Sequence, residues 1–238
     1  MKEEKLFQVG TLNSLRRGDY HGSVSVKDLL KKGDTGIGTY DGLDGEAIIF
    51  NGKAYDGRAD GKVYERKEED KLPFSTVCHF DEKAKENTLS FNSIDEFKEK
   101  RESYLGSHNF FYRIKREGTF TVRVRSCFKQ KEPYEPLYKV ACDQREREYQ
   151  NIDGYVIGVY CPKYVDGRNL PGWHIHFLSK DLTKGGHILK LSGKDIKFKL
   201  NELNGWDVYL PHTEGFSKWD LSEDLKEKTK AVEGSSQK

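Results

Sequence analysis

The sequence predicts a mostly β protein with few helices. The chain of 238 residues contains 23 glycines but only six prolines, and its apolar runs are short and rich in Val, Ile, Phe and Tyr. These runs end at Gly, Asn or Asp, which is typical of strands joined by tight turns. A chain of this length forms one large domain or two small ones, and it can bury a sizeable core without disulfides.

Turn residues divide the predicted strands. Residues 46–65 read EAIIFNGKAYDGRADGKVYE, and the turn dipeptides Asn51-Gly52 and Asp60-Gly61 predict a meander of hairpins there. A second hairpin is predicted where NFFYRIKREG runs into TFTVRVRSC, with its corner at Glu117-Gly118. Further strands are predicted at residues 155–160, 173–179 and 206–210.

Three helices are predicted. Ser93 and Glu96 have the spacing of a capping box, in which each side chain accepts the free N–H of the other residue, and they open a helix that reaches residue 105. A short helix is predicted at residues 26–31. Ser222 can cap a third helix over EDLKEKTKAVE, whose early acids and later lysines suit the helix dipole.

The division into domains is marked only weakly. No linker rich in Pro or Ser interrupts the chain, and the most irregular stretch, residues 129–151, carries Pro133, Pro136 and many charges. We therefore expect an N-terminal β-rich half at residues 1–128 and a C-terminal β-rich half at residues 129–238, or one integrated domain.

The charge balance argues against two classes of partner. The 41 basic side chains nearly cancel the 39 acidic ones and leave a formal charge of +2, so no global field points to nucleic acid or to a membrane. No apolar run is long enough to span a bilayer or to form the core of a signal peptide. We expect a cytoplasmic protein, secreted only if a leader precedes this sequence, with its four cysteines reduced and mostly buried.

Three histidines form the sharpest chemical pattern. The segment GWHIHFLSKDLTKGGH holds His174 and His176 in an H-x-H pattern and ends at His187. Side chains alternate faces along a strand, so His174 and His176 project from the same side. A chain reversal near Asp181-Leu182 places His187 opposite His176, at a Cβ separation of about 4.5–5.5 Å. Three imidazoles then leave one position of a tetrahedral metal ion open, as in catalytic zinc sites.

The histidine pattern is also compatible with roles other than catalytic zinc binding. An isolated H-x-H on a half-buried strand is usually satisfied by hydrogen bonds or solvent, but a third histidine beyond a turn favours a metal site. Neutral imidazole also suits iron, nickel or copper. A structural metal site is the next alternative, although such sites are usually closed and rich in cysteine, and no cysteine is near these histidines in the sequence.

Three blocks of the sequence resemble, in order, the alpha-acetolactate decarboxylase family. They are GDTGIGTYDGLDGEAIIFNGKAY, VRVRSCFKQKEPYEPL and GWHIHFLSKDLTKGGHIL. The resemblance extends over nearly the whole chain, and the blocks are specific only when taken together. It implies an α+β fold of two related β-rich halves, with mixed sheets and few helices, a single Zn²⁺ in the C-terminal half, and a homodimer.

The resemblance also implies which residues form the site. It assigns the metal to the three histidines and catalytic roles to Glu46, Arg125 and Glu233. Without it, Glu46 is best explained as a solvated acid at a loop end, Arg125 as part of an exposed strand face, and Glu233 as an acid of the mobile tail. A guanidinium does present a planar fork that matches a substrate carboxylate. Thr39, in the stretch GIGT, is a further candidate for a substrate contact.

The function that the resemblance implies is the conversion of 2-acetolactate (2-hydroxy-2-methyl-3-oxobutanoate) to acetoin and carbon dioxide. The metal polarises the ketone, and a carboxylic acid of raised pKa, Glu46 or Glu233, protonates one face of the resulting enediolate. The first alternative is a cupin-like metal oxygenase, although the glutamate expected soon after H-x-H is missing. The others are a zinc-dependent ester hydrolase on a related fold and a binding module without activity.

Overall fold

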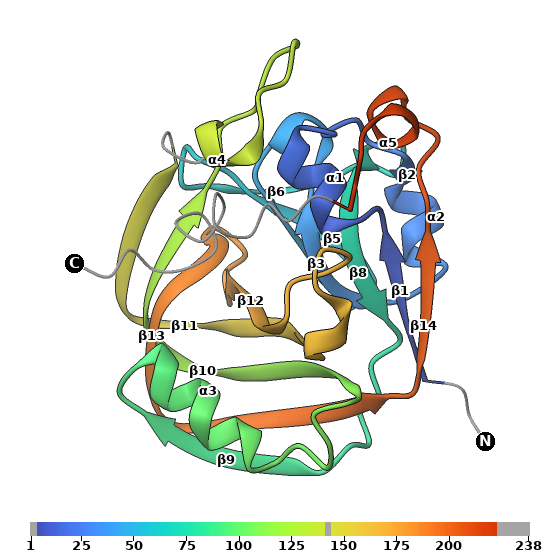
Figure 1. Ribbon diagram of the computed structural model, residues 1–238. Coiled ribbons are helices and arrows are strands. Elements are labelled where there is room, and N and C mark those ends of the chain that lie inside the picture. The colour runs from blue at the N-terminus through green and yellow to red at the C-terminus, as the bar shows by residue number, and fades with distance from the viewer. Residues whose placement is uncertain (1–3, 141–143, 223–238) are drawn as a thin grey trace.

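Two β-sheets packed against each other form most of the molecule (Figure 1). The computed structural model describes residues 4–140 and 144–222. The first sheet has seven strands, in the spatial order β14 (Gly205–Tyr209), β1 (Lys5–Val9), β8 (Phe74–Cys78), β3 (Thr35–Thr39), β4 (Glu46–Phe50), β5 (Lys53–Gly57) and β6 (Val63–Glu65). Strand β14 runs parallel to β1, and the other neighbours are antiparallel. A separate small ribbon pairs β2 (Val24–Ser25) with β7 (Lys71–Leu72).

The second sheet closes on itself. Its strands are β9 (Glu86–Phe91), β10 (Phe111–Ser126), β11 (Arg145–Cys161), β12 (Gly172–Ser179) and β13 (Gly185–Leu203). Strand β10 pairs with β11, β11 with β12, β12 with β13, and β13 pairs back onto β10. These four strands therefore form a closed ring, and β9 is added along β13.

The core lies both inside the ring and between the ring and the first sheet. Alternate residues of each strand point to opposite faces, so one set of apolar side chains, including Ile114 and Phe177, fills the ring. The other set, including Ile157 and Val159, packs with Ile48 and its neighbours from the first sheet. A polar residue on the part of the outer face that the first sheet covers can therefore be buried.

Two of the three predicted helices are confirmed. Helix α2 (Val26–Leu30) begins after Ser25, whose side chain accepts a hydrogen bond from the N–H of Asp28. Helix α3 (Ile94–Glu102) follows Ser93, whose hydroxyl accepts from the N–H of Glu96 at 3.1 Å. The third, predicted after Ser222, lies outside the described residues. Three short helices had no clear pattern in the sequence: α1 (Leu12–Arg17), α4 (Leu137–Val140) and α5 (Glu214–Lys218).

The predicted meander at residues 46–65 is confirmed. Strands β4 and β5 pair around Asn51 and Gly52, whose φ angles are 51° and 73°. Two successive positive φ angles are what a tight two-residue hairpin turn requires, and Asn and Gly adopt them at low cost. Strand β6 then pairs with β5 beyond the second turn, where Gly61 has a φ of 86°.

The predicted hairpin corner at Glu117-Gly118 is wrong. Strand β10 continues through both residues, and Gly118 lies opposite Gly154 of β11. A Cβ on Gly118 would lie 2.5 Å from the Cδ1 atom of Ile196, which is buried in the ring. The glycine is therefore explained by close packing against Ile196 and not by a turn.

The β-rich character with few helices is confirmed, while the division at residue 128 stays a prediction. Each sheet draws on both sides of that position, because β14 joins the first sheet and both β9 and β10 join the second. Three cysteines, Cys78, Cys127 and Cys161, are free and buried, as expected. Within the described residues, no helix is long and apolar enough to cross a membrane.

Candidate active site

Strand β12 places two of the three histidines on one face. Trp173, Ile175 and Phe177 contribute to the core of the ring. His174 and His176 alternate with them and therefore project from the outer face of the ring, toward the first sheet. His176 is completely buried.

His187 reaches the same place through the predicted chain reversal. Leu182 adopts a φ of 60°, and the carboxylate of Asp181 accepts a hydrogen bond from the N–H of Thr183 at 3.0 Å. Strand β13 then returns with His187 directly opposite His176. The prediction that alternation and one turn bring the three histidines together is confirmed.

The three imidazoles converge on one point. His174 Nε2 lies 3.1 Å from His187 Nδ1 and 3.1 Å from His176 Nε2, and one nitrogen from each ring lies within 4.8 Å of the others. The Nδ1 atom of His176 is 3.0 Å from the carbonyl oxygen of Ala47. A carbonyl can only accept, so this nitrogen carries the proton and Nε2 turns its lone pair toward the other rings. Such a support is what metal-binding histidines usually have.

Burial keeps these histidines neutral. It lowers the pKa of all three, that of His176 to about 3, and the positive charge of Arg125 lowers each pKa further. Neutral imidazoles offer free lone pairs at pH 7. Three such donors fit a divalent metal ion with one or more coordination positions left for another ligand.

Glu46 and Arg125 lie beside the histidines. Glu46 is the first residue of β4, and its Oε2 atom is 3.5 Å from His176 Nε2. Arg125 lies opposite His187 on β10 and is only 8% exposed. Its neighbour on the same strand face, Arg123, pairs with Glu148 at the surface. Arg125 differs from Arg123 because it is buried and close enough to Glu46 for its charge to act on the pKa of that carboxyl group, so it is not part of an exposed strand face.

Burial also makes the Glu46 carboxyl a weak acid. It raises the pKa of Glu46 to about 8, and the negative charge of Asp56 contributes to the increase, while Arg125 lowers the pKa in part. The group is therefore mostly protonated at pH 7 and can donate a proton.

A small cavity joins these groups. Its volume is about 90 Å³, and its walls include Thr39, Glu46, Arg125, His174 and His187. The Thr39 hydroxyl donates to the carbonyl oxygen of Gly45 at 2.9 Å, and its lone pairs remain to accept a hydrogen bond. The predicted site residues thus come together, except Glu233, which lies outside the described residues.

Comparison with known proteins decides the family. A family model described as alpha-acetolactate decarboxylase matches residues 6–223. The chain belongs to the alpha-acetolactate decarboxylase family. The alpha-acetolactate decarboxylase of Brevibacillus brevis is 37% identical over 219 residues, which cover 92% of this chain and 77% of that protein. The one from Methanosarcina mazei is 34% identical, with 96% of this chain and 80% of that protein covered.

Solved structures of alpha-acetolactate decarboxylases share the fold. The structure from Bacillus subtilis strain 168 matches with a TM-score of 0.93 at 29% identity, over 97% of this chain and 100% of that chain. A Staphylococcus aureus protein of unknown function, described as similar to alpha-acetolactate decarboxylase, matches with a TM-score of 0.90 at 32% identity, over 96% and 100% of the two chains.

No sequence pattern predicted the other residues that line the cavity. Gln144 and Cys127 line it, and the Gln144 amide donates to the Cys127 sulfur at 3.3 Å. The apolar walls are Leu12, Leu15, Leu43, Phe74, Leu137 and Leu170. These residues come from separate helices, strands and loops of this alpha-acetolactate decarboxylase fold, so no local pattern marks them.

Proposed function

We propose that this protein is a zinc-dependent acetolactate decarboxylase that converts 2-acetolactate to acetoin and carbon dioxide. Family membership supports the reaction. The observation that supports this site best is that three neutral imidazoles converge at one cavity, which His174, His187, the protonated Glu46 carboxyl group and the buried Arg125 guanidinium line. In this proposal His174, His176 and His187 hold one Zn²⁺.

The three histidines supply a donor set that suits zinc and leaves room for substrate oxygen atoms. Bound there, the ion would supply Lewis-acid stabilisation of the negative charge that develops on the ketone oxygen as carbon dioxide leaves. Imidazole donors would also accept iron, nickel or copper, and zinc is the ion that the family resemblance implies.

Arg125 orients the substrate carboxylate in this proposal. A guanidinium is a cation at pH 7 and can present two parallel N–H donors to a carboxylate. The burial of Arg125 beside the histidines strengthens that contact, because water competes less. The same contact must not be too strong, since the carboxylate leaves as neutral carbon dioxide.

Glu46 delivers the proton. The electron pair left by the departing carbon dioxide is shared as an enediolate, and one proton on the former carboxyl-bearing carbon completes acetoin. The raised pKa of Glu46 keeps that proton available at pH 7. The Thr39 hydroxyl accepts a hydrogen bond from the tertiary hydroxyl of the substrate, and Glu233 supplies a second carboxylate. The homodimer and the cytoplasmic location stay predictions.

The cupin-like oxygenase and the ester hydrolase are not favoured, because the chain belongs to the alpha-acetolactate decarboxylase family. The test is to incubate the purified protein with racemic 2-acetolactate under nitrogen and in air, with a blank that lacks the protein. We expect acetoin and carbon dioxide in equal amounts, at the same rate in both atmospheres. A rate no faster than the blank, or a rate that requires oxygen, would refute the proposed reaction.

A further inference from the structure

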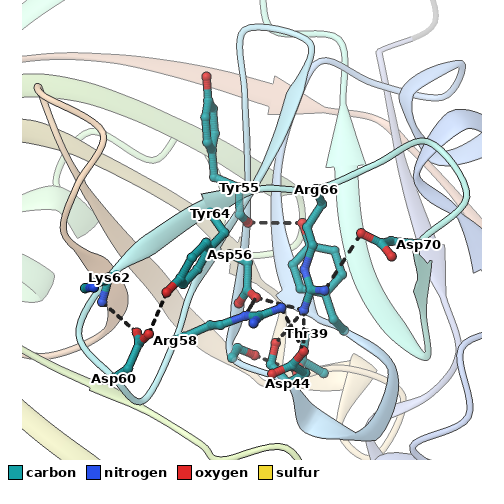
Figure 2. A network of polar contacts seen from close by, with 12 residues as sticks. Thr39, Asp44, Tyr55, Asp56, Arg58, Asp60, Lys62, Tyr64, Arg66 and Asp70 are labelled. Carbon is teal, nitrogen blue, oxygen red and sulfur yellow. Dashed lines mark hydrogen bonds and ion pairs between the residues drawn. The ribbon is translucent and has the colours of Figure 1, made fainter.

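Two arginines and two aspartates form a charge cluster beside the turn that carries Glu46 (Figure 2). Asp56 of β5 is completely buried, and its Oδ2 atom accepts from Arg58 Nε at 2.6 Å and lies 2.8 Å from Arg66 Nη2. Asp44 faces the same two arginines, with its Oδ2 atom 2.7 Å from Arg66 Nη2 and 3.1 Å from Arg58 Nη2. Asp70 is a third carboxylate beside Arg66, with its Oδ2 atom 3.8 Å from Arg66 Nη1.

This cluster fixes the chain at the entry to β4. Arg66 Nη2 also donates to the carbonyl oxygen of Asp44 at 3.2 Å, and Thr39 holds the carbonyl oxygen of Gly45. Gly45 has a φ of +78°, and a Cβ there would lie 2.0 Å from Asp56 Oδ1. The two residues before Glu46 are therefore held by a guanidinium, a hydroxyl and a buried carboxylate.

The cluster is itself anchored on the first sheet. The Arg66 guanidinium lies over the ring of Tyr40, 4.4 Å from its centroid, and the Tyr40 hydroxyl donates to the carbonyl oxygen of Tyr55 at 3.0 Å. The backbone N–H of Arg66 donates to the carbonyl oxygen of Ala54 at 2.8 Å. The guanidinium thus has little freedom to move, and it restricts the Asp44-Gly45 turn to one position.

Stability alone does not account for such a cluster. Buried ion pairs contribute little more to folding than apolar side chains of the same volume, because desolvation of the charges offsets their attraction. A proton donor, by contrast, must be held within about 0.5 Å of its productive position. Asp44 of the cluster is two residues before Glu46, and Asp56 lies opposite Ala47, whose carbonyl oxygen is 3.0 Å from His176 Nδ1.

We propose that Asp56 and Arg66 are positioning residues, which hold the Asp44-Gly45 turn so that Glu46 meets the substrate in the geometry for proton delivery. This role rests on the proposed function, in which Glu46 is the proton donor. Neither residue lines the cavity that Glu46, His174 and His187 line, so neither contacts the substrate, and both act through Glu46.

Two conservative variants test this role. Asp56→Asn keeps the shape but removes the charge, and Arg66→Lys keeps the charge but cannot reach two carboxylates and a carbonyl at once. Both should lower kcat about 10–100-fold and change KM and the zinc content per chain by less than about twofold, as expected when a reacting group is displaced by about 1 Å. Lys53→Ala is the matched control, because Lys53 forms an exposed ion pair with Glu65 on the same hairpin. It should leave kcat unchanged.

A double-mutant cycle separates positioning from a general loss of structure. In a Glu46→Gln background, Arg66→Lys should lower kcat no further, because the group that it positions is already gone. A folded Arg66→Lys protein with normal kcat, or an equal loss in both backgrounds, would overturn the proposal. Amide hydrogen exchange over residues 41–50 is independent of turnover. Exchange should be faster in both variants. Unchanged exchange would show that Asp56 and Arg66 do not hold the Asp44-Gly45 turn, even if the wild-type protein made no acetoin.

Discussion

His176→Ala is expected to lose both zinc and acetoin formation. His176 is one of the three proposed zinc ligands. It is completely buried, its Nε2 atom is 3.1 Å from His174 Nε2, and its ring is fixed by the carbonyl oxygen of Ala47. With two imidazoles left, the affinity for zinc should fall by more than about 100-fold. Loss of a residue that only hydrogen-bonds to a metal ligand already lowers metal affinity about 10–100-fold. The measurements are zinc per chain after dialysis and the rate of acetoin formation.

The control for this variant is His79→Ala. The His79 side chain is 69% exposed and lies away from the cavity, next to Asp34, so its removal should change neither zinc content nor rate. Circular dichroism of His176→Ala checks that the fold persists, because the substitution leaves a small buried void. A folded His176→Ala protein that keeps stoichiometric zinc would show that this histidine is not a ligand.

Glu46→Gln is expected to keep the zinc and lose turnover. The amide has the size of the carboxyl group but no acidic proton, so kcat should fall by about 100-fold or more, which is the usual contribution of a general acid. Arg125→Ala should instead raise KM, because loss of the group that binds the substrate carboxylate weakens substrate binding. Steady-state kinetics on zinc-loaded proteins separate the two effects. Normal turnover by Glu46→Gln would remove this residue from the chemistry and leave Glu233 as the remaining carboxyl candidate.

The histidine site could be predicted from local sequence because local rules build it. Alternation along one strand places His174 and His176 on one face, and a single turn sets His187 opposite His176. Glu46 and Arg125 could not be placed in this way. Each comes from another strand, and they meet the histidines only because the first sheet packs on the outer face of the ring. Their roles were predicted from the family resemblance alone.

The wrong hairpin at Glu117-Gly118 has the same origin. A glycine after a polar residue indicates a turn when only neighbours in the sequence are considered, yet here it makes room for Ile196 from a strand almost 80 residues later in the chain. Closure of the ring by β13, and the apolar walls of the cavity, also depend on contacts between distant segments. Periodicity and turn residues carry no information about such contacts.

The most direct test of zinc-dependent decarboxylation is a zinc titration of protein that has been stripped with a chelator. Zinc is added stepwise, and acetoin formation from 2-acetolactate is measured together with bound zinc. We predict that the stripped protein is no faster than the blank and that the rate rises in proportion to zinc and levels off at about one ion per chain, the stoichiometry of a single three-histidine site. Rapid acetoin formation by fully stripped protein, or zinc binding without any gain in rate, would contradict a zinc-dependent reaction at this site.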